Sequence, residues 1–203
     1  MSRPRHVVLL GDSTIDNELY VDGGRPVPEH LRSLLDEGDR VTMLAVDGHT
    51  SVDTAGEQIP RIPDDATHLV LSVGGNDALG YVGLLQQPVD TVAAGFALMG
   101  PGVVDFESSY RTCLEAVLEH RLPTVACTIY NGNFALDERD VIRTAVRLFN
   151  DVILQSASDR RVPVIDLRQV CADPSDYFDP IEPNDQGGRK IAVAIADETG
   201  RMG

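Results

Sequence analysis

The chain has 203 residues, 42% of them apolar, and a formal net charge of −15 at pH 7. This length predicts a single domain, residues 1–203, that is large enough to bury a core. The acidic charge argues against nucleic-acid binding, because phosphate contacts need clustered Lys and Arg, and it is poorly suited to anionic membranes.

Five short runs rich in Val, Ile and Leu show little alternation of apolar and polar residues, which is typical of parallel strands buried on both faces of a sheet. They cover residues 6–10, 41–46, 68–73, 123–129 and 162–167. Longer amphipathic stretches separate these runs. The alternation of strand and helix predicts an α/β fold, a three-layer α/β/α sandwich around a parallel, doubly wound sheet of about five strands.

Two of the amphipathic stretches repeat their apolar residues at the 3.6-residue spacing of a helix. They cover 106–118, with Asp105 as the expected N-cap, and 141–153, after Asp137 as the expected cap. Shorter helices are expected at 28–35 and 189–196.

Residues 79–104 are the least regular part of the chain, with five glycines and two prolines. This composition predicts a loop or a broken helix. Such a segment near a site could serve as a lid.

Three cysteines, Cys113, Cys127 and Cys171, lack metal-ligand spacing and are typical of isolated thiols in a reducing cytosol. No run approaches the ~20 apolar residues of a membrane helix, and the run at 7–11 is too short for the core of a signal peptide. Glycine-rich phosphate-binding motifs are also missing. We therefore expect a cytoplasmic protein with no membrane partner, no cofactor and no metal.

Polar, glycine-rich residues follow each expected strand. They are Gly11-Asp12-Ser13, Asp47-Gly48-His49, Gly74-Gly75-Asn76-Asp77 and Tyr130-Asn131-Gly132, with Asp179 and Glu182 in the loop after the fifth strand. Turn geometry explains any one of these residues by itself. Because ligands of an open α/β sheet bind outside the carboxyl ends of its strands, the whole set favours a binding or catalytic edge.

The blocks "GDST" at 11–14, Gly48, "GGND" at 74–77 and "DPIEPNDQGG" at 179–188 follow in this order over nearly the whole chain. In order and spacing they resemble the SGNH (GDSL-type) hydrolase family. The resemblance implies the strand order 2-1-3-4-5 and a serine esterase or acyl hydrolase. No G-x-S-x-G elbow is present, which separates the chain from the α/β-hydrolase superfamily.

The resemblance also assigns roles to residues. It implies that Ser13 is the nucleophile, whereas by itself Ser13 could be an ordinary helix N-cap. It implies an oxyanion hole made by the N–H groups of Ser13 and Gly48 and the side-chain amide of Asn76. Asp12 and Asp77 are then expected to brace the site by accepting hydrogen bonds from turn amides.

The base is where this chain departs from the family, which has a histidine three residues after an aspartate. This chain has Asp179-Pro180-Ile181-Glu182 instead. Of its histidines, only His49 lies at the expected edge, and it is more simply a turn residue than a replacement base.

Glu182 therefore has three interpretations. As a base it would be weak at its reference pKa of ~4.3, although burial and Asp179 would raise that pKa. Alternatively, it marks a site that binds a ligand and turns it over slowly or not at all. In the third interpretation it is a structural acceptor in the turn, while Asn184 caps the last helix.

The leading hypothesis is an esterase acting on a small ester, such as a sugar acetate or short acyl ester, with Asp179 and Glu182 as a proton-handling pair. The alternative is a binding or regulatory module that keeps the pocket without a working base. A small-molecule ester is the expected partner, and self-association is left open.

Overall fold

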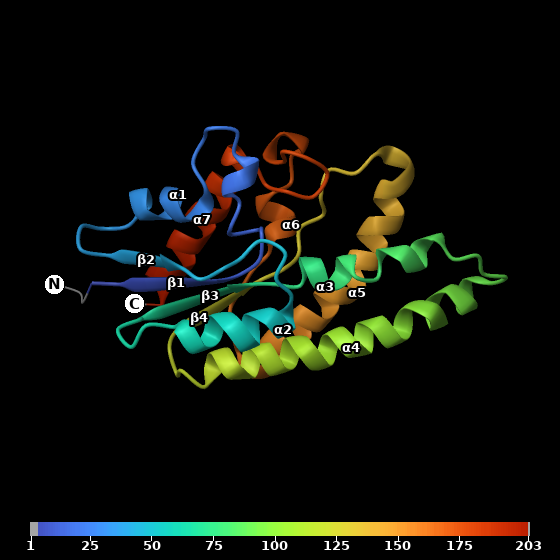
Figure 1. Ribbon diagram of the computed structural model, residues 1–203, viewed down its shortest axis with the longest axis horizontal. Coiled ribbons are helices and arrows are strands. Elements are labelled where there is room, and N and C mark those ends of the chain that lie inside the picture. Colours follow the sequence, from blue (N-terminus) through green and yellow to red (C-terminus); the bar gives the residue numbers. More distant parts are fainter. Residues whose placement is uncertain (1–3, 203) are drawn as a thin grey trace.

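The computed structural model of the protein describes residues 4–202. Its centre is a sheet of five parallel strands in the order β2-β1-β3-β4-β5, which confirms the predicted α/β fold and strand order (Figure 1). The strands are β1 (His6–Gly11), β2 (Arg40–Met43), β3 (His68–Ser72), β4 (Thr124–Cys127) and β5 (Val164–Ile165). Each overlaps one of the five predicted runs.

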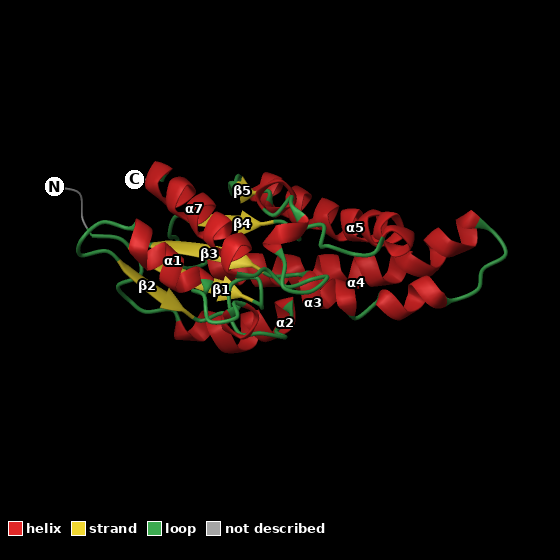
Figure 2. Cartoon of the chain, turned by 90° about the horizontal axis from the view of Figure 1, so that it is seen from above, coloured by secondary structure: helices red, strands yellow, loops and turns green. Residues whose placement is uncertain are grey.

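Helices cover both faces of the sheet (Figure 2). The helices are α1 (Val27–Leu34), α2 (Ser51–Asp53), α3 (Gly75–Leu79), α4 (Val92–Leu118), α5 (Leu136–Arg160), α6 (Leu167–Val170) and α7 (Asp185–Arg201). Short 3₁₀-helices lie at Glu18–Tyr20, Ile59–Arg61, Val82–Gln86 and Pro174–Asp176, and a π-helix at Thr54–Gln58. Helix α1 packs on α7, and α4 packs on α5.

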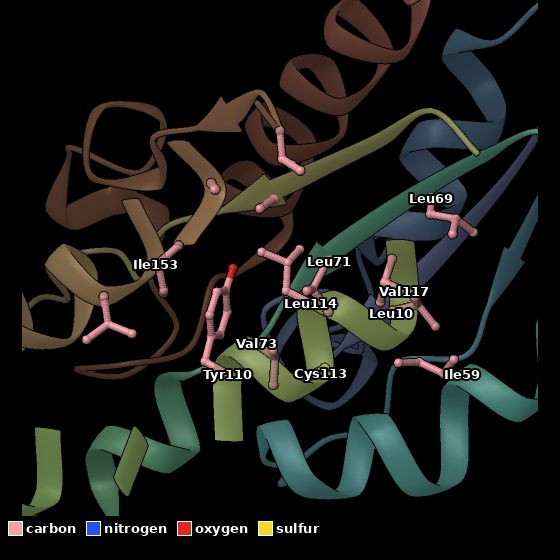
Figure 3. Close-up of a cluster of buried hydrophobic side chains, with 14 of the residues drawn as sticks. Leu10, Ile59, Leu69, Leu71, Val73, Tyr110, Cys113, Leu114, Val117 and Ile153 are labelled. Atoms are coloured by element: carbon pink, nitrogen blue, oxygen red, sulfur yellow. The ribbon is translucent and has the colours of Figure 1, made fainter. Parts of the chain in front are cut away.

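The central strands are apolar throughout because both of their faces are covered. Val8 and Leu10 of β1 enter the core shared with α4 and α5, whereas Val7 and Leu9 enter the core shared with α1 and α7. Figure 3 shows the first of these cores, in which Leu71, Tyr110 and other side chains of the sheet and α4 meet. Successive strand residues point to opposite faces, so a two-sided core requires an unbroken apolar run.

Helix α4 corrects one expectation for the middle of the chain and agrees with another. It starts at Val92, where the Thr91 hydroxyl accepts a hydrogen bond from the N–H of Ala94, so Asp105 lies inside the helix and is not its N-cap. Residues 79–104 form a broken helix, one of the two predicted alternatives, with a turn at 80–81 and an irregular connection at 87–91. The exposed Pro101 is tolerated inside the helix, because water can bond the carbonyl that lacks an N–H partner.

The other helices begin close to where they were expected. Asp137 lies in the first turn of α5, where its charge favours the helix dipole, but the N-cap is Ala135. Helix α7 begins four residues before the predicted start, and the side chain of Asn184 caps it as expected. The three cysteines are free and buried. Within residues 4–202, no helix is both long enough and apolar enough to cross a bilayer.

The end of β1 fixes the edge from which the polar residues project. Gly11 has φ +137°, and a Cβ there would lie 1.8 Å from the carbonyl oxygen of Ser72 on β3. The buried side chain of Gln58 bonds both the N–H and the carbonyl of Gly11, each at 2.8 Å. Only glycine allows the two strands to approach this closely while the chain turns into Asp12 and Ser13.

We expect Gly11→Ala to reduce the free energy of unfolding by more than ~3 kcal/mol, because the added methyl group meets a backbone oxygen that cannot move aside. Gly23→Ala is the matched control, since Gly23 has φ +80° but no atom within 4 Å of a built Cβ. It should cost only about 1–2 kcal/mol. Urea unfolding measures both, and equal losses would contradict the close approach at Gly11.

Candidate active site

Ser13 lies in the turn directly after β1 and is 6% exposed. Asp12 shapes this turn by accepting the N–H of Thr14 at 3.0 Å. The O–H group of Ser13 donates a hydrogen bond to Oε1 of Glu182, with 3.2 Å between the two oxygens. The structure thus brings together the serine and the carboxylate that the sequence singled out.

Glu182 is held in place by a turn built from its neighbours. Oδ1 of Asp179 accepts the N–H groups of Ile181 and Glu182, both at 2.8 Å. Asn184 accepts two amides at the start of α7 and donates to two carbonyls of the preceding loop. Holding the turn is therefore the work of Asp179 and Asn184, while the Glu182 carboxylate is directed to Ser13.

The expected pairing of Asp179 with Glu182 takes a different form in the structure. No hydrogen bond in residues 4–202 joins the two carboxylates, because Asp179 is engaged with the backbone. Asp179 acts on Glu182 by positioning its backbone and by its nearby negative charge.

The Glu182 carboxyl lies in an environment that opposes its ionisation. It is 7% exposed, and its Oε2 atom has no hydrogen-bond partner within the described residues. Burial raises its pKa from 4.5 to about 7; the Ser13 hydrogen bond opposes this, and the charges of Asp12, Asp47 and Asp179 add to it. A group with this pKa changes its protonation state near neutral pH, as an imidazole does.

Two further aspartates brace the site. Burial raises the pKa of Asp12 to about 6, although its hydrogen bonds with Thr14 lower that pKa. Asp77 accepts the N–H of Ser51 at 3.0 Å, and burial raises its pKa as well. Asp12 thus accepts an amide of the turn after β1, and Asp77 accepts the first amide of α2.

Of the three expected oxyanion donors, Ser13 and Asn76 line one cleft, and Gly48 precedes His49, whose carbonyl Asn76 bonds. Nδ2 of Asn76 donates one N–H to the carbonyl of His49 at 3.1 Å. The second N–H of the Asn76 amide has no acceptor among the described residues. Among the described residues, the N–H groups of Ser13 and Gly48 have no acceptor. Gly48 has φ +85°, and a Cβ added there would meet no atom within 4 Å. The left-handed backbone conformation, not lack of space, therefore favours glycine at this position.

His49 is turned toward residues other than Ser13. Its Nδ1 lies 3.0 Å from Nε2 of Gln58, and its Nε2 lies 3.9 Å from Glu57. Gln58 therefore links His49 to the end of β1 through its bonds with Gly11. Sequence reasoning missed Gln58, and only the π-helix around it, a feature often found near functional sites, marks the position.

The remaining histidines lie away from Ser13. His6 and His68 begin β1 and β3 at the opposite edge of the sheet. His30, on α1, is bonded to Asp185 at 2.9 Å, and His120 follows the end of α4. None of these four side chains lines the cleft described next.

An open cleft leads away from Ser13 between α3, α4 and α5. Its inner end carries the polar groups of Asp12, Ser13, Asn76 and Glu182. The rest is mainly apolar and is lined by Val73, Ala78, Leu79, Tyr81, Val82, Leu85, Met99, Ile129, Tyr130, Phe134, Ile142, Ala145, Val146, Phe149 and Ile181. Such a space suits an apolar group whose polar end lies at Ser13.

Comparisons with known proteins agree with this architecture. Residues 9–190 match the sequence profile of the GDSL-like Lipase/Acylhydrolase family. No protein with a curated function matches the sequence significantly.

Solved structures with the same fold include three enzymes at 17–18% identity, a level that establishes the fold alone. A phospholipase A1 from Streptomyces albidoflavus NA297 has a TM-score of 0.72 and 18% identity over 97% of this chain and 100% of its own. An acetylxylan esterase from Geobacillus stearothermophilus has a TM-score of 0.70 and 18% identity over 97% and 94%. An extracellular lipase from Streptomyces rimosus has a TM-score of 0.67 and 17% identity over 97% and 99%.

The raised pKa of Glu182 predicts a pH-dependent loss of stability. The folded chain keeps this proton over a pH range in which the unfolded chain has released it, so stability falls as pH rises from about 4.5 through about 7. Glu182→Gln removes the buried charge. The variant should match the wild type at pH 4 and be more stable at pH 8 by up to ~3 kcal/mol.

Urea unfolding at pH 4, 6 and 8 measures this difference. Glu138→Gln, in the exposed first turn of α5, is the matched control and should follow the wild type at each pH. Equal stabilities of Glu182→Gln and wild type at pH 8 would show that Glu182 carries no such penalty.

Proposed function

The chain belongs to the GDSL-like lipase/acylhydrolase family, and from this premise we propose that it is a carboxylic-ester hydrolase in which Ser13 attacks and Glu182 serves as the base. The observation that carries the proposal is the hydrogen bond from Ser13 to a buried glutamate whose pKa is about 7. A carboxylate of ordinary pKa accepts a serine proton poorly, whereas one near 7 has the basicity usual for a general base at neutral pH.

In the first half of the proposed reaction, Ser13 Oγ bonds to the ester carbonyl carbon as its proton moves to Glu182 Oε1. The carbonyl oxygen becomes an oxyanion, which the N–H groups of Ser13 and Gly48 and the free N–H of Asn76 stabilise. Glu182 then returns the proton to the leaving alkoxide oxygen as the C–O bond breaks. An alcohol departs and the acyl group stays on Ser13.

In the second half, a water molecule attacks the acyl carbon while Glu182 Oε1 again accepts a proton. A second oxyanion forms at the same donors and collapses as the bond to Ser13 breaks. The proton passes from Glu182 to Ser13 Oγ, and the carboxylic acid departs. The enzyme returns to its starting state with no external reactant other than water.

The proposal predicts the pH dependence of turnover. Because the reactive form of Glu182 is the carboxylate, kcat/KM for p-nitrophenyl butyrate should rise about tenfold per pH unit below 7 and level off above it. Glu182→Gln should lower the plateau by about 10²–10⁴-fold. Glu182→Asp, which retains a carboxylate, should keep a pH-dependent rate, and Ser13→Ala should show no turnover.

Rates measured from pH 5 to 9 decide between this enzyme and the alternative. Turnover by Ser13→Ala equal to that of the wild type would remove the nucleophile and leave a binding module. A Glu182→Gln profile identical to that of the wild type would assign the base to another group.

The cleft supports a substrate with a longer acyl chain than the acetate or short ester expected from the sequence. Its mainly apolar lining, which runs from Ser13 to side chains of α3, α4 and α5, extends beyond what an acetyl group would contact. The enzymes of similar fold include both a phospholipase A1 and an acetylxylan esterase, so the fold alone does not select the acetyl ester. The apolar lining favours a fatty acyl group extending from Ser13 toward Met99 and Phe149.

Chain-length dependence tests this substrate class. Each buried methylene group contributes about 0.8 kcal/mol, so kcat/KM should increase at least tenfold from p-nitrophenyl acetate to octanoate. Ala145→Phe fills the cleft and should abolish this increase while sparing acetate. Ala94→Phe, at an exposed position outside the cleft, should leave it unchanged. A wild type that prefers acetate would restore the small-ester hypothesis.

A further inference from the structure

The core-facing stripe of α4 continues beyond the core. Its members follow one another at intervals of three and four residues, which places them on one face of the helix. They include Val92, Phe96, Met99, Val103 and Phe106. Phe106 is buried, and Val103 and Met99 pack against the same core. The outer part of the stripe therefore has the character of a core surface.

The two outermost residues of this stripe have no cover. Val92 is 77% exposed and Phe96 is 59% exposed. Val82 and Val89, in the segment that leads into α4, are also exposed. Both views show this segment projecting past the carboxyl edge of the sheet, and we call residues 79–104 the projecting arm (Figures 1 and 2).

The projecting arm is almost uncharged in a strongly acidic chain. Asp90 is its only charged side chain, whereas the whole chain has 32 Asp and Glu residues and a net charge of −15. An exposed apolar surface of this kind marks a site of interaction. Each copy of the chain has a net charge of −15, and the repulsion between two copies opposes self-association. A lipid surface without net charge does not repel the chain in this way.

The projecting arm is also continuous with the cleft. Leu79, Tyr81, Val82, Leu85 and Met99 belong to the arm and line the cleft. The same segment thus forms a wall of the cleft and the exposed apolar surface beside it. Phe96 lies about one helical turn before Met99, which lines the cleft.

We propose that the projecting arm docks on the surface of zwitterionic lipid, with Val92 and Phe96 entering its apolar boundary. Docking of this kind buries apolar side chains at the boundary between headgroups and acyl chains without spanning the bilayer. It differs from the expectation of no membrane partner, which rested on net charge. The use of docking, delivery of acyl chains to the cleft, rests on the proposed ester hydrolysis, but lipid binding itself does not.

Flotation with phosphatidylcholine vesicles tests the docking without any need for turnover. The wild type and Ser13→Ala should float with the vesicles. Val92→Asp/Phe96→Asp should lower the partition coefficient at least tenfold, because charge replaces two buried apolar groups. The control Leu34→Asp/Val52→Asp changes two exposed apolar residues of α1 and α2 and should float like the wild type. Vesicles with added phosphatidylglycerol should bind the wild type less, because their charge repels the acidic body.

Several outcomes would overturn the proposal. The first is a wild type that does not float with the vesicles, and the second is equal flotation of the two double variants. The third is a wild type that binds no lipid but forms a dimer, detected by light scattering, which Val92→Asp/Phe96→Asp dissociates. Turnover of p-nitrophenyl butyrate in solution separates this proposal from the proposed function. Flotation of a wild type that hydrolyses no ester would retain the docking and reject the hydrolase.

Discussion

The hydrogen bond between Ser13 and Glu182 joins residues 169 positions apart in the chain, and the site depends on it. It places a carboxylate beside a nearly buried hydroxyl, with one oxygen bonded and the other without a donor among the described residues. Burying a charge with so few partners opposes folding at neutral pH. The two apolar cores, one on each face of the sheet, offset this cost. Unfavourable local electrostatics of this kind are typical of functional sites.

The topology of the sheet brings Ser13, Asn76 and the cleft to one edge. Because all five strands are parallel, the turns after β1 and β3 emerge side by side and carry Ser13 and Asn76. The chain after β3 then continues through α3 into the projecting arm and returns along α4. The cleft therefore begins at Ser13, and the segment that extends beyond the sheet forms part of its wall.

The sequence predicted what depends on short-range pattern. Runs such as 6–10 revealed the strands because both faces of the sheet are buried, and the shared edge predicted that Ser13 and Glu182 would meet. The start of α4 could not be predicted, because the glycines and Pro101 have low helix propensity. Packing of Met99 and Val103 against the core stabilises the helix there.

Other features of the site depend on the folded environment. The contact of Gln58 with Gly11 crosses 47 positions, and the raised pKa of Glu182 comes mainly from burial. In a Ser–His pair, proton transfer creates an imidazolium that an aspartate stabilises. In the proposed Ser–Glu pair it neutralises Glu182, and the negative charge passes to the oxyanion, so a neighbouring carboxylate has no cation to stabilise. Asp179 bonds backbone amides, which agrees with this proposal. Under the same proposal, the N–H donors of Ser13, Gly48 and Asn76 would stabilise the transition state.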